Sequence, residues 1–256
     1  MPIISERFVS ILLIGTMLIF LQLNYDPQLG NTFLAMLVVT ILLSLKDSKI
    51  TIPVQRHNIV KSFTIGIIGY LAFLGISTIV IPSLRAFNLS SIIDLYSAAS
   101  QPFFANNFWF TLISFGIVIP YIETDFFFGK APEALIDWTS NLGVSWDLKN
   151  IKFWAVAALF VFLFVIMHIT AKIQQVKFNE AMALIGLFAL VSMVIVAVYR
   201  ETLGSIFMHI IANTTSILDS FNIVQSTYVI LGAIGLALLL MVIAKQFNLR
   251  IIRSAA

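Results

Sequence analysis

Residues 201–218, ETLGSIFMHIIANTTSIL, form an apolar stretch that carries His209 and Asn213 four positions apart. On an α-helix this spacing places both side chains on one face, so an imidazole and a carboxamide project together toward the neighbouring helices. Both groups need hydrogen-bond partners wherever water is excluded. The stretch therefore predicts a buried helix with half of a polar site on one side, and the rest of the chain must supply the other half.

The composition predicts an integral membrane protein. Of the 256 residues, 60% are hydrophobic and 11% are charged, and the mean hydropathy is +1.01. A soluble core of this size cannot hide so much apolar surface. Several apolar runs are long enough for a helix to cross a bilayer, and they do not alternate as the strands of a membrane β-barrel do. The chain has no cysteine, which excludes disulfides and thiol chemistry.

We predict an all-α fold, a polytopic membrane helical bundle of about eight transmembrane helices in a single integral-membrane domain, residues 1–256. Between these helices, residues 83–107 are expected to form an interfacial segment, and residues 129–150 a polar connection whose charges lie in water. The helices are expected at about 8–23, 32–45, 63–82, 108–128, 153–171, 181–199, 203–218 and 228–244.

The distribution of Lys and Arg predicts the orientation. If both termini are cytosolic, Arg85, Lys172 and Lys177 lie outside, and the other twelve of the fifteen Lys and Arg residues lie inside. This asymmetry follows the positive-inside rule and predicts a multi-pass protein, in the cell membrane if the source is prokaryotic. Because the basic residues cluster at helix ends, the net charge of +3 does not indicate a nucleic-acid partner. The expected surroundings are the lipid bilayer.

Four polar residues inside the apolar runs are candidates for a functional site, because a charge near the bilayer centre costs roughly 2.5–3.5 kcal/mol. They are Glu123, His168, His209 and Asn213. A buried carboxyl such as Glu123 suits general acid or base chemistry, and an interfacial cap or ion pair is the alternative. His168 alone is weak support for a site. For His209 and Asn213, the alternative is ordinary hydrogen bonding between membrane helices.

Taken in order, Glu123, Phe164-x-x-x-His168 and His209-x-x-x-Asn213 resemble the three motifs of the CAAX prenyl protease and bacteriocin-processing family of intramembrane glutamic endopeptidases. The similarity covers a core of about residues 107–218. It implies an endopeptidase in which Glu123 and His168 activate water, while His209 and Asn213 hold the oxyanion of the scissile carbonyl. It also implies a membrane-associated peptide or protein substrate, such as a prenylated C-terminus or a leader peptide.

The first motif departs from the family pattern Glu-Glu-x-x-x-Arg. The chain has Thr124 in place of the second Glu and Phe128 in place of the Arg. Asp125 is one position out of register, and one residue turns a helix by about 100°, so Asp125 cannot simply replace the missing Glu. The departures put catalytic activity in question more than the fold.

Helix depth gives the catalytic interpretation a geometric condition. Glu123 falls near the inner end of the helix expected at 108–128, whereas His168 lies about 20 Å along the helix expected at 153–171. Either the first of these helices continues toward Trp138, or the second begins deeper in the aqueous phase. A distance above about 10 Å between Glu123 and His209 would exclude the proposed chemistry.

Two other kinds of protein stay open from the sequence. One is a non-catalytic membrane scaffold or binding relative that keeps the polar cluster for helix packing, and the other is a small-solute transporter with a proton relay. We expect no cofactor. Zinc is not excluded, because Glu and His are zinc ligands, although the amide of Asn213 is a poor one and His-Glu-x-x-His is absent.

Overall fold

The structure of the protein is a computed structural model that describes residues 59–80, 108–169 and 178–223, together with single positions between 228 and 242. Within these ranges the chain is helical and contains no strand, in agreement with the predicted fold class. Three helices are long and apolar enough to cross a membrane, which indicates an integral membrane protein: Ile59–Val80, Thr111–Trp138 and Asn179–Tyr199.

Four of the described helices match predicted ones to within a few residues. They are α3 (Ile59–Val80), α8 (Ile151–Ile169), α9 (Phe178–Tyr199) and α10 (Leu203–Ser220). The helices predicted at 8–23 and 32–45, the interfacial segment, both termini and nearly all of 228–244 lie outside the described residues. The predicted number of about eight spans and the orientation therefore stay predictions.

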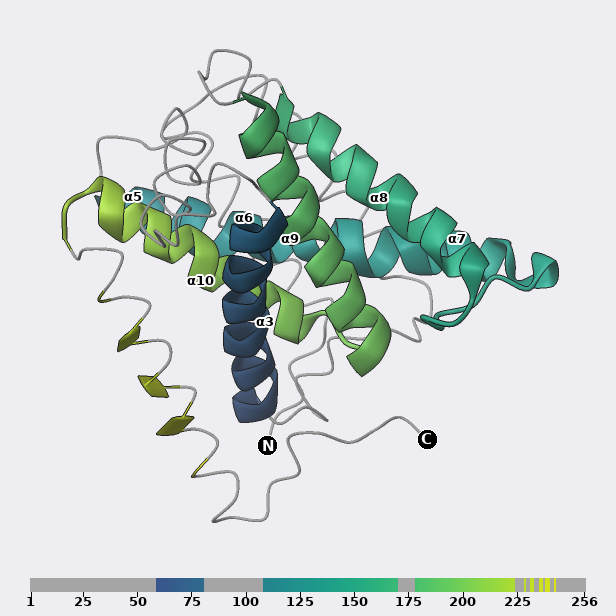
Figure 1. Ribbon diagram of the computed structural model, residues 1–256, viewed down its shortest axis with the longest axis horizontal. Coiled ribbons are helices and arrows are strands. Elements are labelled where there is room, and N and C mark those ends of the chain that lie inside the picture. The colour runs from purple at the N-terminus through teal and green to yellow at the C-terminus, as the bar shows by residue number, and fades with distance from the viewer. Residues whose placement is uncertain are drawn as a thin grey trace.

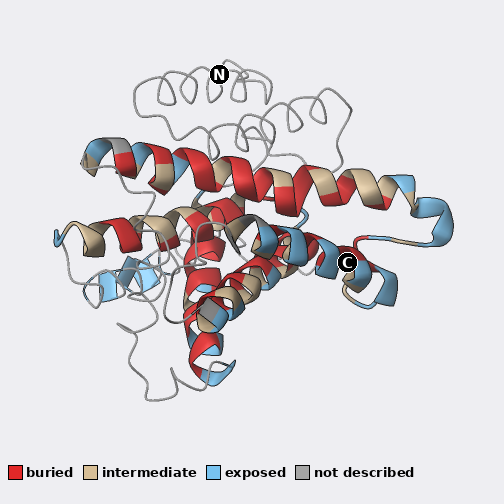
Figure 2. Cartoon of the chain, turned by 90° about the horizontal axis from the view of Figure 1, so that it is seen from above, coloured by how far each residue is buried: buried red, intermediate tan, exposed pale blue. Residues whose placement is uncertain are grey.

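The helix predicted at 108–128 continues to Trp138 through five helical segments without a break. These are α5 (Phe108–Ile113), η3 (Ser114–Val118), α6 (Ile119–Thr124), η4 (Asp125–Lys130) and α7 (Ala131–Trp138). We call this run the long helix. Figure 1 shows it passing behind α3, and Figure 2 shows that it is buried over much of its length. This continuation is the first of the two alternatives that the depth argument left open.

Both π-helical segments of the long helix end just before a proline. The N–H of Ile119 bonds to the carbonyl of Ser114, and Pro120 follows as the second residue of α6. Downstream, the N–H of Ala131 bonds to Phe126, and Pro132 follows in the same way. A proline lacks the N–H and crowds the preceding turn, so a wider turn ahead of it lets the helix continue. The short α6 is thus held between two π segments.

The prediction that the charges of residues 129–150 lie in water is wrong for the first part of that segment. Lys130 and Glu133 are buried, with 2% and 6% of their surfaces exposed. Gly129 and Pro132 resemble a helix break in the sequence, but η4 carries the chain past them into α7. The segment leaves the bundle only after Trp138, which is 80% exposed.

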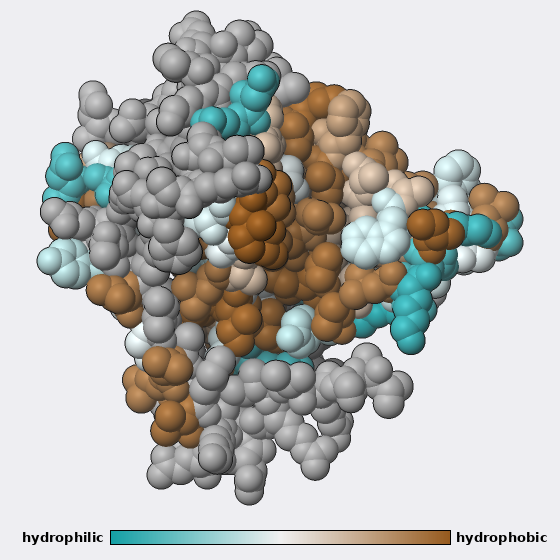
Figure 3. Space-filling model, viewed as in Figure 1, coloured by the Kyte–Doolittle hydropathy of each residue, from teal (hydrophilic) through white to brown (hydrophobic). Residues whose placement is uncertain are grey.

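A hairpin of residues 139–150 joins α7 to α8. Gly143 has a φ of 75°, a left-handed conformation that favours glycine. The side-chain amide of Asn150 donates to the Gly143 carbonyl at 2.8 Å, and Lys152 Nζ donates to the Leu142 carbonyl. Figure 3 shows hydrophilic residues at this hairpin and hydrophobic surface over α8 and α9.

Helices α3 and α10 cross at two glycines. A Cβ on Gly66 would lie 2.6 Å from Phe207 Cβ and 2.9 Å from the backbone N of Met208, and one on Gly204 would lie 2.8 Å from Ile65 Cγ2. The absence of a side chain at Gly66 thus allows the two helices to approach closely. Gly69 is similar, since its Cβ would lie 2.6 Å from Ile195 Cδ1, but around Gly75 nothing lies within 4 Å. Gly75 is therefore not a contact of this kind among the described residues.

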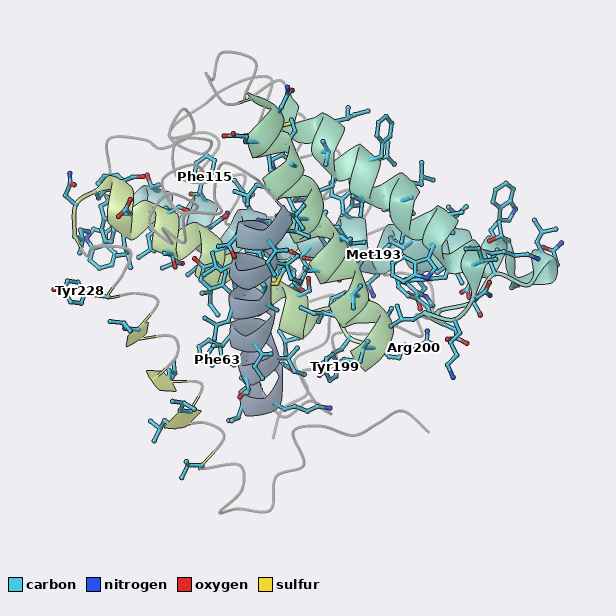
Figure 4. All side chains as sticks on the ribbon, in the orientation of Figure 1. Phe63, Phe115, Met193, Tyr199, Arg200 and Tyr228 are labelled. Carbon is cyan, nitrogen blue, oxygen red and sulfur yellow. The ribbon has the colours of Figure 1, made fainter. Side chains whose placement is uncertain are left out.

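The start of α3 also meets the corner between α9 and α10. The Ser62 hydroxyl donates to Oε1 of Glu201 at 2.9 Å, and both residues are buried. Lys61 Nζ lies 5.6 Å from the centre of the Tyr199 ring. Figure 4 shows Tyr199 and Arg200 at this end of the bundle, whereas Met193 lies further along α9 and is fully buried. Contacts at this corner hold the start of α10 against α3. They therefore help to set the position of His209 relative to the other helices.

Candidate functional site

Helix α6 carries two buried polar residues, Glu123 and Thr124, with 3% and 0% of their surfaces exposed. Both side chains face neighbouring helices rather than solvent. Helix α10 packs against α6 and η3 and brings His209 to the same place, and α8 brings His168. Three elements that are distant in sequence therefore meet at Glu123.

The carboxyl group of Glu123 lies between two imidazoles. Its Oε1 is 4.0 Å from Nε2 of His168, and its Oε2 is 3.7 Å from Nε2 of His209. Both separations are longer than a direct hydrogen bond. They are short enough for a strong electrostatic interaction in a site with little water. The structure thus brings together Glu123, His168 and His209, and it meets the distance condition set by the sequence.

The tautomer of His168 follows from its second nitrogen. Nδ1 lies 2.7 Å from the carbonyl oxygen of Phe164, one turn earlier on α8. A carbonyl only accepts hydrogen bonds, so Nδ1 carries the proton and donates it. The neutral imidazole therefore presents a bare, basic Nε2 to Glu123. Its side chain is 20% exposed, which makes His168 the more accessible of the two imidazoles.

His209 is enclosed more tightly than His168. Its Nδ1 lies 3.0 Å from Oγ1 of Thr124. The ring of Phe188 packs on the imidazole with centroids 4.8 Å apart, and the ring of Phe164 lies edge-on at 6.2 Å. With 2% of its surface exposed, His209 is held by contacts on several sides, so its Nε2 has a fixed direction toward Glu123.

Asn213 has a different partner from His209. Its side-chain amide donates to the carbonyl oxygen of Phe115 at 2.8 Å. In the register of η3, the next backbone bond after the one from Ile119 would run from residue 120 to Phe115, but Pro120 has no N–H to donate. Asn213 supplies the donor that the proline cannot. Its bond thus ties α10 to the long helix, and the predicted oxyanion role of Asn213 stays a prediction.

Replacing Asn213 with Ala is expected to lower the free energy of unfolding by about 1 kcal/mol, because the partly buried carbonyl of Phe115 loses the donor that Asn213 provides. In a Pro120→Ala background the loss should be smaller, since residue 120 can then donate to Phe115. Thermal unfolding of the four proteins of this cycle in detergent measures the coupling. Equal losses in the two backgrounds would show that the proline does not create the need for Asn213.

The structure also shows the surroundings of the residues that depart from the first motif of the CAAX prenyl protease pattern. Phe128 is fully buried with its ring centre 5.1 Å from that of Phe164, so an apolar contact stands where the family has Arg. The hydroxyl of Thr202 donates to Oδ1 of Asp125 at 3.5 Å, which directs this carboxylate toward the corner before α10. Thr124 instead contacts His209 within the site.

Sequence reasoning missed Thr124 and Phe188 as parts of the site. In the sequence motif Thr124 is only the replacement of a Glu, and the signal that could have found it is its position next to Glu123, where one imidazole can contact both side chains. Phe188 carries no local signal, because it is one of 23 phenylalanines and its contact depends on how α9 packs. Among the described residues, no three His, Cys, Asp or Glu side chains are arranged to hold a metal ion.

No family model, curated protein or solved structure matches the chain. The fold and the site define a helical membrane protein with a buried carboxyl between two histidines. Function is therefore argued from the site itself and from the three sequence motifs.

Proposed function

We propose that the protein is an intramembrane endopeptidase that hydrolyses a peptide bond of a membrane-associated substrate, as the motif resemblance suggests. The observation that carries this proposal is the position of the Glu123 carboxyl, whose two oxygens lie 4.0 Å and 3.7 Å from Nε2 of His168 and Nε2 of His209. A carboxylate and a basic imidazole together suit the deprotonation of water.

In the proposed reaction, Glu123 and the bare Nε2 of His168 take a proton from water as its oxygen bonds to the scissile carbonyl carbon. The resulting oxyanion is held by an N–H of His209. When the carbon–nitrogen bond breaks, the stored proton passes to the leaving amine. The products are a carboxylic acid, which gives up the second proton of the water to solvent or to the amine, and an amine, and Glu123 and His168 return to their starting state. Asn213 holds α10 in place through Phe115.

A lipid-attached or membrane-inserted peptide suits the surroundings of the site. The surface of α8 is apolar, with Leu163 and Ile166 exposed by 39% and 42% on other faces of the helix than that of His168. A peptide with an apolar chain can therefore lie against α8 without leaving a hydrophobic environment. Prenylated C-terminal peptides and leader peptides both have this character, and the proposal covers both.

A cleavage assay tests the proposal. Purified protein in liposomes is incubated with a peptide that ends in a prenylated cysteine motif, with its unprenylated counterpart and with a hydrophobic leader peptide, and the products are identified by mass spectrometry. We expect cleavage of at least one lipid-attached or hydrophobic peptide, at a rate that chelators leave unchanged. Loss of cleavage on chelation, restored by zinc, would replace the water-activation scheme with metal catalysis. Intact peptides throughout would contradict the proposal.

A non-catalytic binding relative is the second candidate function. It is favoured by the departures at Thr124 and Phe128 and by the structural bond of Asn213. On that account, a hydrophobic peptide binds to the liposome-embedded protein without being cut, and Glu123→Gln alters neither binding nor fold. The same peptide set separates the two candidates.

A further inference from the structure

The positions of the protons around Glu123 follow from the contacts of the two imidazoles. The Phe164 carbonyl requires Nδ1 of His168 to be the donor and so leaves Nε2 without a proton in the neutral ring. That nitrogen faces Oε1 of Glu123 at 4.0 Å. The backbone of α8 thus sets the state of the first imidazole.

The next step fixes the role of the second carboxyl oxygen. If Glu123 is protonated, its one proton is best placed on Oε1, toward the basic Nε2 of His168. If His168 takes the proton instead, Glu123 is a carboxylate and both its oxygens are acceptors. In either state Oε2 is an acceptor. It lies 3.7 Å from Nε2 of His209, so attraction requires a proton on that nitrogen.

A neutral His209 with a proton on Nε2 has a bare Nδ1, which needs a donor because the ring is buried. The Thr124 hydroxyl is 3.0 Å away and fully buried. Of the residues that the structure describes, Phe188 and Phe164 also pack against this ring, and neither side chain can donate a hydrogen bond to Nδ1. A hydroxyl can donate or accept, and only donation fits the bare nitrogen.

We infer that Thr124 is a positioning residue: its hydroxyl donates to Nδ1 of His209 and thereby directs the Nε2–H of that ring at Glu123. The two imidazoles of the site then have opposite tautomers, one presenting a base and the other a donor. The effect of Thr124 on catalysis rests on the proposed function, in which His168 accepts a proton and His209 holds the oxyanion. The inferred tautomers of the two histidines do not depend on that function.

Nitrogen-15 NMR of protein labelled only at histidine tests this inference, because the chain has three histidines, His57, His168 and His209. His168→Gln and His209→Gln assign the signals. At neutral pH we expect His209 to have a protonated Nε2 and a bare, hydrogen-bonded Nδ1, and His168 to have the reverse. A protonated Nδ1 on His209 in the unaltered protein would overturn the inference.

Two variants at Thr124 give a matched comparison. Thr124→Ser keeps a hydroxyl and should leave the His209 signals unchanged, whereas Thr124→Val keeps the shape but removes the donor and should move the Nδ1 signal downfield. An unchanged Nδ1 signal in a folded Thr124→Val protein would overturn the inference. If the valine variant does not fold, the tautomer of the unaltered protein and the serine variant still decide.

Kinetics give a readout that separates this inference from the proposed function. If the protein cleaves peptides, Thr124→Val should lower kcat about tenfold with little change in KM, and Thr124→Ser should restore most of it. If the protein cleaves no peptide, the proposed function fails while the nitrogen signals still test the role of Thr124. An unchanged kcat together with an unchanged Nδ1 signal would count against Thr124 as a positioning residue.

Discussion

Replacing Glu123 with Gln is expected to lower the rate of peptide hydrolysis about 1,000-fold while the protein stays folded. Gln has nearly the same shape as Glu but cannot take up a proton from water, and the Glu123 carboxyl faces both imidazoles. The initial rate of cleavage in liposomes measures the effect, and thermal unfolding in detergent confirms the fold.

The control for this variant is Asp137→Asn, the same change of charge further along the same helix. Asp137 lies on α7 near the hairpin, outside the Glu123 cluster. We expect its rate of cleavage to stay within about twofold of the unaltered protein, as is usual for changes away from a site. Equal rates for Glu123→Gln and Asp137→Asn would contradict the role assigned to Glu123.

The largest expected effect on stability comes from Gly66→Ala, which should lower the free energy of unfolding by about 3 kcal/mol. The added methyl group would lie 2.6 Å from Phe207 Cβ and 2.9 Å from the backbone N of Met208. Backbone cannot move aside as a flexible side chain can, so α3 and α10 must separate. Thermal unfolding in detergent measures the loss, and cleavage should also fall because α10 carries His209.

Gly75→Ala provides the matched control on the same helix. A methyl group there meets nothing within 4 Å, and alanine is the better helix former by up to about 1 kcal/mol. We expect stability to be unchanged or slightly raised. A similar loss for the two variants would indicate that α3 tolerates no side chain at either glycine and that the crossing at Gly66 is not special.

The apolar runs of the sequence predict four of the helices around the site well. Long apolar runs predict α3, α8, α9 and α10 to within a few residues, because burial in apolar surroundings requires helices whose backbone groups are satisfied internally. The proximity of Glu123 to the two histidines was expected only from the order of the motifs. Nothing in the local sequence shows it, since helix packing decides which residues meet.

What could not be predicted depends on the two π segments. In a regular α-helix, Gly129 and Pro132 suggest an end, whereas the wider turns of η3 and η4 let the long helix continue. The shared face of His209 and Asn213 is predicted from their spacing, but the two residues lie about one helical turn, or about 5.4 Å, apart along α10 and have different partners. His209 lies beside Glu123 and Thr124, whereas Asn213 donates to the carbonyl of Phe115.

Cleavage in water enriched in oxygen-18 tests the central claim most directly, because water is the nucleophile in the proposed reaction. We expect the new C-terminal carboxylate of the product to carry one heavy oxygen in a single turnover with the unaltered protein, and labelled product to form about 1,000 times more slowly with Glu123→Gln. A new carboxylate without heavy oxygen, or labelled product at the same rate from Glu123→Gln, would contradict the assignment of Glu123 as the group that activates water.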